Sequence, residues 1–163
     1  MESEKKWTND VCAVKCAKRG NDVYKSRVER RFRGICRLSE NLIFFNPKDR
    51  NSNRTTKALF LTLTYDTKRS SYSEAWKSIG VEFNSFMANV RKEFGKVSSC
   101  RVFESFENGY PHIHCILLFE KEFSVFRDRQ GKFRIREKQV FAEVWHSHVD
   151  VRAVDSLTCL AYL

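Results

Sequence analysis

One long amphipathic segment in the middle of the chain limits the folds that are open to it. Ser71 and Glu74 have the spacing of a capping box, in which each side chain bonds the backbone of the other residue. Apolar residues then recur at steps of three and four until Gly95, which is typical of a helix with one buried face. These residues are Trp76, Ile79, Phe83, Phe86, Met87, Val90 and Phe94. Such a helix must pack on another layer, and we expect that layer to be a sheet.

The segments around this helix have the composition of β-strands. The run 58–65 alternates apolar and hydroxyl side chains near its end and places Thr62 and Thr64 on one face. Two further strand-like runs, 97–106 and 112–119, lie on either side of Asn108-Gly109, which is a hairpin signal. The later elements that we expect are a charged loop or protruding basic ribbon at 120–136, a helix at 137–146, a strand at 148–154 and a third helix from the N-cap Asp155 to Leu163.

The order strand, helix, strand, strand, helix, strand, helix predicts an α+β fold. It is the order of the ferredoxin-like, split βαβ arrangement, in which an antiparallel sheet carries its helices on one face. The other face is left open, and we expect the active site there.

The first 57 residues differ from the rest of the chain. Basic residues crowd 15–37, where Arg30, Arg31 and Arg33 form a short run, and the polar stretch 46–57 has the composition of a loop or linker. We therefore expect two domains, a basic N-terminal extension over 1–57, with short helices around 8–18 and 21–33, and a second domain over 58–163.

The net charge, the apolar runs and the cysteines of the chain indicate which class of partner it binds and in which cellular compartment it acts. The chain has 30 Lys and Arg against 20 Asp and Glu, a formal net charge of +10, which favours a nucleic acid as partner. No apolar run reaches the roughly 18 residues that span a bilayer, and no secretory signal follows Met1, so we expect a cytoplasmic protein without a membrane partner. The six cysteines are then expected to be reduced. Cys12, Cys16 and Cys36 are interpreted as ordinary buried thiols, with a structural zinc site as the alternative.

Two histidines on one predicted strand are the strongest chemical signal. His112 and His114 are two residues apart, so their side chains leave the same face of the strand. They could be a hydrogen-bonded pair, or two ligands of a metal ion that takes its third ligand from the preceding strand. An odd or bulged loop would place Glu104 opposite His112, whereas a two-residue turn would favour Glu107. Pro111 cannot donate a ladder hydrogen bond and favours the irregular hairpin, hence Glu104.

This donor set predicts the kind of metal. Two imidazoles and one carboxylate leave open positions for water or substrate, and Cys115 points to the other face of the strand. We therefore expect Mn²⁺ or Mg²⁺, with Zn²⁺ as a further option. In a basic protein such an ion would polarise a scissile phosphate.

Several of these residues together resemble a known family. The motifs are Phe-Leu-Thr-Leu-Thr at 60–64, Glu104, Gly-Tyr-Pro-His-Ile-His at 109–114, Trp-His-Ser-His-Val-Asp at 145–150 and Ala-Tyr-Leu at 161–163. Over residues 58–163 the chain resembles the nuclease domain of the HUH endonucleases. The nearest likeness is to the rolling-circle replication initiators (Rep proteins) of plasmids and viruses.

The resemblance implies a ferredoxin-like nuclease that binds single-stranded DNA at a replication origin, at a hairpin or nick site, with a host helicase or polymerase as further partners. It makes His112 and His114 metal ligands with Glu104 as the third, and it gives Thr62 and Thr64 a place in the DNA surface.

The resemblance also implies a tyrosine nucleophile on the last helix. In the family this tyrosine attacks the phosphate and leaves a 5′-phosphotyrosyl protein and a free 3′-OH. Tyr162 matches the first tyrosine of the motif Tyr-x-x-x-Tyr or Tyr-x-x-Lys-Tyr, whose remaining residues would fall beyond Leu163, so we expect a C-terminally truncated domain. The alternatives are a nucleophile beyond Leu163 and a packing role for Tyr162.

Basic residues after the histidines are candidate DNA contacts. They are Arg127, Arg129, Lys132, Arg134 and Arg136, interleaved with Phe126 and Phe133. Such a pattern fits a groove that tracks phosphates and stacks bases, with a solvated charged ribbon as the alternative. His146 and His148 are interpreted as surface or DNA-facing groups, with a second metal site as the alternative.

The leading hypothesis is therefore a metal-dependent, site-specific single-stranded DNA nickase that initiates rolling-circle replication. A transposase or relaxase with the same chemistry and a non-catalytic single-stranded nucleic-acid-binding module are the alternatives.

Overall fold

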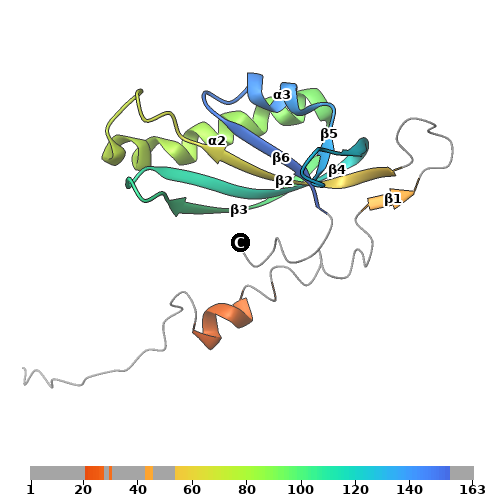
Figure 1. Cartoon of the computed structure of the whole chain (residues 1–163). Coiled ribbons are helices and arrows are strands. Elements are labelled where there is room, and N and C mark those ends of the chain that lie inside the picture. The colour runs from red at the N-terminus through yellow and green to blue at the C-terminus, as the bar shows by residue number, and fades with distance from the viewer. Residues whose placement is uncertain (1–20, 28–29, 31–42, 46–53, 155–163) are drawn as a thin grey trace, which may run out of the picture. The chain divides into compact units, whose positions relative to one another are not determined.

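A computed structural model of the chain describes residues 21–27, 30, 43–45 and 54–154 (Figure 1). The chain divides into two compact units, Met1–Arg37 and Leu38–Leu163. In the first unit, residues 22–27 and 30 are helical, and the side chain of Asn21 caps this helix by accepting a hydrogen bond from the Tyr24 backbone N–H at 2.8 Å. This agrees with the helix expected at 21–33. The helix expected at 8–18 and the three cysteines of the N-terminal segment lie outside the described residues, as does the helix expected from Asp155.

The second unit contains a mixed set of strands and helices. In chain order they are β1 (Ile43–Phe45), β2 (Arg54–Thr64), α2 (Tyr72–Phe94), β3 (Val97–Ser105), β4 (Pro111–Arg127), β5 (Phe133–Ile135), α3 (Lys138–Glu143) and β6 (Val149–Ala153). The central strands have the order β6-β2-β4-β3, and every neighbouring pair is antiparallel. β1 pairs with the beginning of β2, and β5 pairs with the end of β4. Both helices lie on one face of the sheet (Figure 1). The predicted α+β, ferredoxin-like fold is confirmed.

Two strands extend further than predicted. β2 begins at Arg54, so residues 54–57, expected in the linker, belong to the sheet. β4 continues to Arg127 and forms a hairpin with β5, where the sequence predicts a loop or ribbon. The pairing of β2 with β4 passes through an irregularity between Thr56 and Ala58, where the charged residues 120–122 are exposed. Beyond it, Phe123, Val125 and Ile135 are buried.

The helix α2 has the predicted capping box and the predicted apolar stripe. The Ser71 hydroxyl accepts from the Glu74 backbone N–H, and the Ser71 N–H donates to the Glu74 carboxylate at 3.0 Å. The buried residues of the stripe are Ala75, Ile79, Phe83, Phe86, Met87, Val90 and Phe94. Trp76 was wrongly placed in it, since its side chain is 39% exposed and lies beside the stripe that begins at Ala75. Its indole N–H instead donates to the Gly109 carbonyl at 2.9 Å, which ties the start of α2 to the β3–β4 turn.

The helix predicted at 137–146 is shorter than expected. α3 ends at Glu143 rather than at 146. The chain then turns so that Trp145 is buried in the core and its indole N–H donates to the Thr64 carbonyl at 2.7 Å. This bond holds the end of β2 and the beginning of β6 next to each other.

Alternation along β2 and β4 divides the sheet into two chemically different faces. Leu61, Leu63, Ile113 and Cys115 are fully buried in the core. Their neighbours in sequence point the other way, and the pairing Thr62 with His114 places hydroxyl and imidazole side by side on the face away from the helices. We call this the open face.

Candidate metal centre

The register of the β3–β4 hairpin brings a carboxylate to the two histidines. Glu104 is paired with His112, and Ser105 with Pro111, across the loop 106–110. The loop has an odd number of residues, as predicted for Glu104 to face the histidines. Gly109 closes it with a φ of +85°, a conformation that favours glycine. Glu107 lies in this turn, outside the paired strands.

Three potential ligand atoms converge on the open face. The Nε2 atoms of His112 and His114 are 2.9 Å apart. The Glu104 Oε2 atom lies 3.7 Å from the His112 Nε2 and 3.6 Å from the His114 Nε2. Among the described residues these three form a group that could hold a metal ion, with one ligand atom from each within 4.8 Å of the others. The predicted donor set is therefore brought together.

Neighbouring side chains orient both imidazoles. The Thr62 hydroxyl is hydrogen-bonded to the His114 Nδ1 at 3.0 Å, so the opposite ring nitrogen faces Glu104. The Phe60 ring stacks against His114 with centroids 5.6 Å apart, and Phe106 meets His112 edge to face at 4.7 Å. The rings are thus held by packing as well as by one hydrogen bond.

The electrostatics of the centre favour neutral imidazoles. Burial lowers the pKa of His112, and Glu104 offsets only part of that shift. Burial and the neighbouring His112 lower the pKa of His114, with Arg152 adding to the effect and Glu104 opposing it. In the part of the chain that the structure describes, the buried Nδ1 of His112 has no hydrogen-bond partner, which disfavours an imidazolium further.

Neutral imidazoles suit a metal site. Each has a nitrogen lone pair to give, and a carboxylate beside them adds a negative charge. Two such lone pairs facing each other across 2.9 Å repel unless a proton or a cation lies between them. The donor set and its geometry therefore fit a divalent ion.

A comparison with protein-family models shows to which family the chain belongs. Residues 58–163, more than half of the chain, match the model of a family described as replication-associated protein ORF2. The chain belongs to this replication-associated protein family. Membership gives it a role in DNA replication and implies an interaction with DNA. No curated protein and no solved structure matches the chain significantly. No helix in the described ranges is long and apolar enough to cross a membrane.

In this family member an arginine that sequence analysis missed lies beside the candidate metal centre. Asp150 and Arg152 lie on the open face, because β6 pairs them with Thr62 and Phe60 of β2. The Arg152 side chain is 43% exposed, and its Nε donates to Asp150 Oδ2 at 2.7 Å. The signal in the sequence was the alternation Val-Asp-Val-Arg-Ala, but only the pairing of β6 with β2 shows which site it serves.

The predicted basic residues of the β4–β5 hairpin are not equivalent. Arg127, Arg129 and Arg136 are exposed, and Lys132 is half-buried. Arg134 is engaged by two carboxylates, with its Nε donating to Asp128 at 2.8 Å and its Nη1 donating to Asp150 and to the Val151 carbonyl. Its contacts fasten the hairpin to β6, whereas the other four side chains carry positive charge at or near the surface.

The two later histidines lie in different surroundings. His146 is packed inside rather than facing solvent or DNA, a correction to the interpretation above. Its Nδ1 lies 3.0 Å from the Glu82 carboxylate, and its ring meets the Tyr65 ring at 4.9 Å. His148 is exposed, and its carbonyl accepts a hydrogen bond from the Thr64 N–H at 3.0 Å. Tyr162, the expected nucleophile, lies outside the described residues.

Proposed function

We propose that this chain is a metal-dependent, site-specific single-stranded DNA endonuclease that initiates rolling-circle replication. The observation that carries the proposal is the convergence of Glu104, His112 and His114 on the open face of an antiparallel sheet. Its setting supports the proposal, because the chain is a basic member of a replication-associated family. As an HUH endonuclease it would be encoded by a plasmid or a virus and act inside the cell.

The chain's own residues prepare the site for a phosphate. A divalent ion held by Glu104, His112 and His114, which we propose to be Mn²⁺ or Mg²⁺, would polarise the scissile phosphate as a Lewis acid. Thr62 fixes the orientation of the His114 ring through its 3.0 Å hydrogen bond. Arg152 offers a positive charge to the DNA backbone beside the centre.

The nucleophile in this proposal is Tyr162. Its phenol oxygen attacks the scissile phosphorus and forms a new P–O bond, while the bond from phosphorus to the 3′ oxygen breaks. The phenol proton passes to solvent, and the departing 3′ oxygen takes up a proton. The cut strand then ends in a free 3′-OH, and its 5′ phosphate stays on the tyrosine.

The partner is single-stranded DNA at a replication origin. The open face carries the proposed metal centre, Thr62, Thr64 and Arg152. The exposed Arg127, Arg129 and Arg136 of the β4–β5 hairpin, with Lys132, would add phosphate contacts.

The experiment is a covalent-capture assay. The protein is incubated with a mixed-sequence single-stranded DNA pool labelled at its 3′ end, with Mn²⁺, and an SDS-resistant protein–DNA band is sought. We expect a band that is lost with EDTA and in His114→Ala, Glu104→Gln and Tyr162→Phe. Glu107→Gln is the matched control, since the same substitution in the nearby turn should keep the band.

Each departure from this result has a distinct meaning. A band that persists in EDTA would refute metal dependence, and one that persists in Tyr162→Phe would move the nucleophile to another residue. DNA binding without any band in wild type would favour the non-catalytic binding module. Direct titration of the protein with Mn²⁺ alone shows in each case whether the centre itself binds metal.

A further inference from the structure

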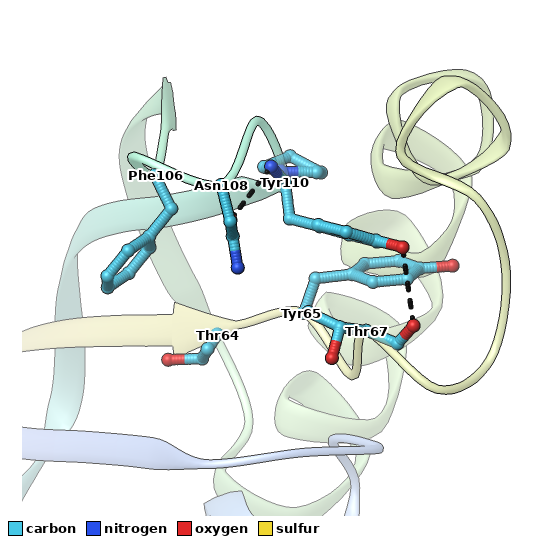
Figure 2. A pocket seen from close by; sticks show the side chains of 7 residues that line it. Thr64, Tyr65, Thr67, Phe106, Asn108 and Tyr110 are labelled. Atoms are coloured by element: carbon cyan, nitrogen blue, oxygen red, sulfur yellow. Dashed lines mark hydrogen bonds between the residues drawn. The ribbon is translucent and has the colours of Figure 1, made fainter.

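A pocket lies next to the metal centre, between the β3–β4 turn and the end of β2 (Figure 2). The pocket is small, with a volume of about 90 Å³, and it is open to solvent at its mouth. Its lining combines aromatic and apolar side chains with a few polar ones, which is typical of small-molecule sites. The lining residues used below are Thr64, Tyr65, Thr67, Phe106, Asn108 and Tyr110.

Aromatic side chains line two sides of this pocket (Figure 2). Phe106 forms one wall; it is 49% exposed, and its other contact is with the His112 ring. The second wall is the pair Tyr65 and Tyr110, whose rings stack with centroids 6.3 Å apart (Figure 2). The Tyr110 hydroxyl donates to the Ser70 carbonyl at 2.9 Å, which keeps this wall in place. A flat aromatic ligand could stack here.

One polar group is aimed into the pocket. The Asn108 Oδ1 accepts a hydrogen bond from the Tyr110 backbone N–H at 3.1 Å, and this bond determines which way the amide is turned. The Asn108 nitrogen therefore points into the space between Phe106 and the paired tyrosines (Figure 2). It is a donor with no acceptor recorded among the residues that the structure describes.

The chemistry of the lining selects the ligand. Among the described residues no charged side chain lines the pocket, so its occupant is neutral, flat and small, with an acceptor at its edge. Thr64 belongs both to this lining and to the open face, where β2 pairs it with His112. A strand crossing the metal centre would therefore bring its neighbouring base to the mouth of the pocket.

We propose that the pocket binds one unpaired DNA base next to the scissile phosphate and reads its identity. This inference rests on the proposed function, because it needs single-stranded DNA on the open face. The base stacks on Phe106, and the Asn108 amide nitrogen donates to a carbonyl oxygen on the base edge. Guanine O6 and thymine O4 are such acceptors, whereas adenine and cytosine carry an amino group at the equivalent position. For a base that enters with this edge first, the pocket therefore favours a keto base.

The test is selection for binding, carried out in EDTA so that the result does not depend on metal or on cleavage. A random-sequence single-stranded 20-mer pool is enriched on wild type and on Asn108→Asp, and the selected pools are sequenced. The aspartate side chain would keep the acceptor for the Tyr110 N–H and replace the inward donor by an acceptor. We expect wild type to enrich guanine or thymine at one position of the selected sequence. With Asn108→Asp, we expect the base preference at that position, and at no other, to change to adenine or cytosine.

Two further variants separate recognition from folding and from general charge. Asn89→Asp makes the same substitution on an exposed position of α2 and should leave the selected sequence unchanged. Phe106→Ala removes an exposed ring and should weaken binding of the selected 20-mer by about fivefold or more, the loss of one stacked base. Since no phosphate contact is removed, the dependence of affinity on salt should stay the same.

The outcomes distinguish this inference from the proposed function. If wild type does not bind or enrich any single-stranded sequence in EDTA, the base pocket is refuted, whereas the proposed function is decided separately by the capture assay with Mn²⁺. If wild type binds and enriches a sequence, but Asn108→Asp and Phe106→Ala select and bind as wild type does, the base pocket alone is refuted. Thermal melting of each variant shows that the comparison is made between folded proteins.

Discussion

Replacing Thr62 by valine is the sharpest test of how the proposed metal centre is held. Valine has nearly the shape of threonine and is equally suited to a strand, so β2 and its pairing should survive. What is lost is the 3.0 Å hydrogen bond between the Thr62 hydroxyl and the His114 Nδ1. The His114 ring then loses the partner that determines its tautomer, and its Nε2 becomes a weaker ligand.

The contacts around His114 indicate how much metal affinity this substitution should cost. Loss of a residue that supports a metal-bound histidine typically weakens metal binding by about 10- to 100-fold, or roughly 1.4–2.8 kcal/mol. The Phe60 ring remains stacked on His114 with centroids 5.6 Å apart, and the other two ligands are unchanged. Water can also reach the half-exposed site of the lost hydroxyl. We therefore expect Thr62→Val to raise the Kd for Mn²⁺ by about tenfold, at the lower end of that range.

The assay is titration of metal-free protein with Mn²⁺, followed by calorimetry or by the electron paramagnetic resonance signal of the free ion. Thr64→Val is the matched control. Thr64 lies on the same strand and face, but among the described residues its hydroxyl has no recorded hydrogen bond to either histidine. Its substitution should change the Kd for Mn²⁺ by less than about threefold, which is about 0.65 kcal/mol. A Thr62→Val protein that binds like wild type, or a Thr64→Val protein that is weakened equally, would refute the reasoning.

Three further outcomes are expected. Arg152→Ala should weaken single-stranded DNA binding and reduce the slope of log affinity against log salt by about one, measured by fluorescence anisotropy across salt concentrations; an unchanged slope would exclude a phosphate contact. Burial alone would raise the pKa of Asp150, but hydrogen bonds donated by Arg134 and Arg152 outweigh it and hold that pKa below its ordinary value. Asp150→Asn should therefore lower the free energy of unfolding at pH 7 by about 1–3 kcal/mol, measured by urea titration. The difference in unfolding free energy between wild type and variant should narrow below about pH 4, because the wild-type carboxylate is then protonated. A difference that does not depend on pH would contradict this. Ser71→Ala removes the cap of α2 and should cost about 1 kcal/mol in the same urea assay at pH 7, whereas an unchanged midpoint would show that the cap contributes nothing.

The elements that could be predicted are those whose signals are local. The capping box and the three- and four-residue repeat of α2 lie within one stretch of chain, and both are present in the structure. The ends of β2 and β4 were misjudged because the charged residues 120–122 and Lys57 interrupt the apolar pattern at exposed positions. A strand continues there because its partner offers backbone hydrogen bonds, and that partner lies far away in the sequence.

The same distinction applies to the functional residues. Glu104, His112 and His114 come from one hairpin, so the parity of its loop was enough to bring them together in prediction. Arg152 reaches the centre only through the pairing of β6 with β2. His146 was misplaced because its partner, Glu82, belongs to α2 and contacts it only after the helix has packed on the sheet. Contacts between distant segments of this kind leave no pattern in a single sequence.

The stability of the core and the geometry of the metal centre depend on the same strand. β4 presents Ile113, Cys115 and Leu117, all fully buried, to the helices and presents His112 and His114 to the open face. A slip of one residue would exchange the two sets, turning three apolar side chains to the open face and two imidazoles toward the apolar core. Exposing three buried side chains costs about 1.5–3 kcal/mol each, and burying imidazoles without partners adds to that cost. The hydrophobic alternation of β4 therefore excludes the neighbouring register, in which Glu104 would be paired with Pro111 or Ile113 instead of His112.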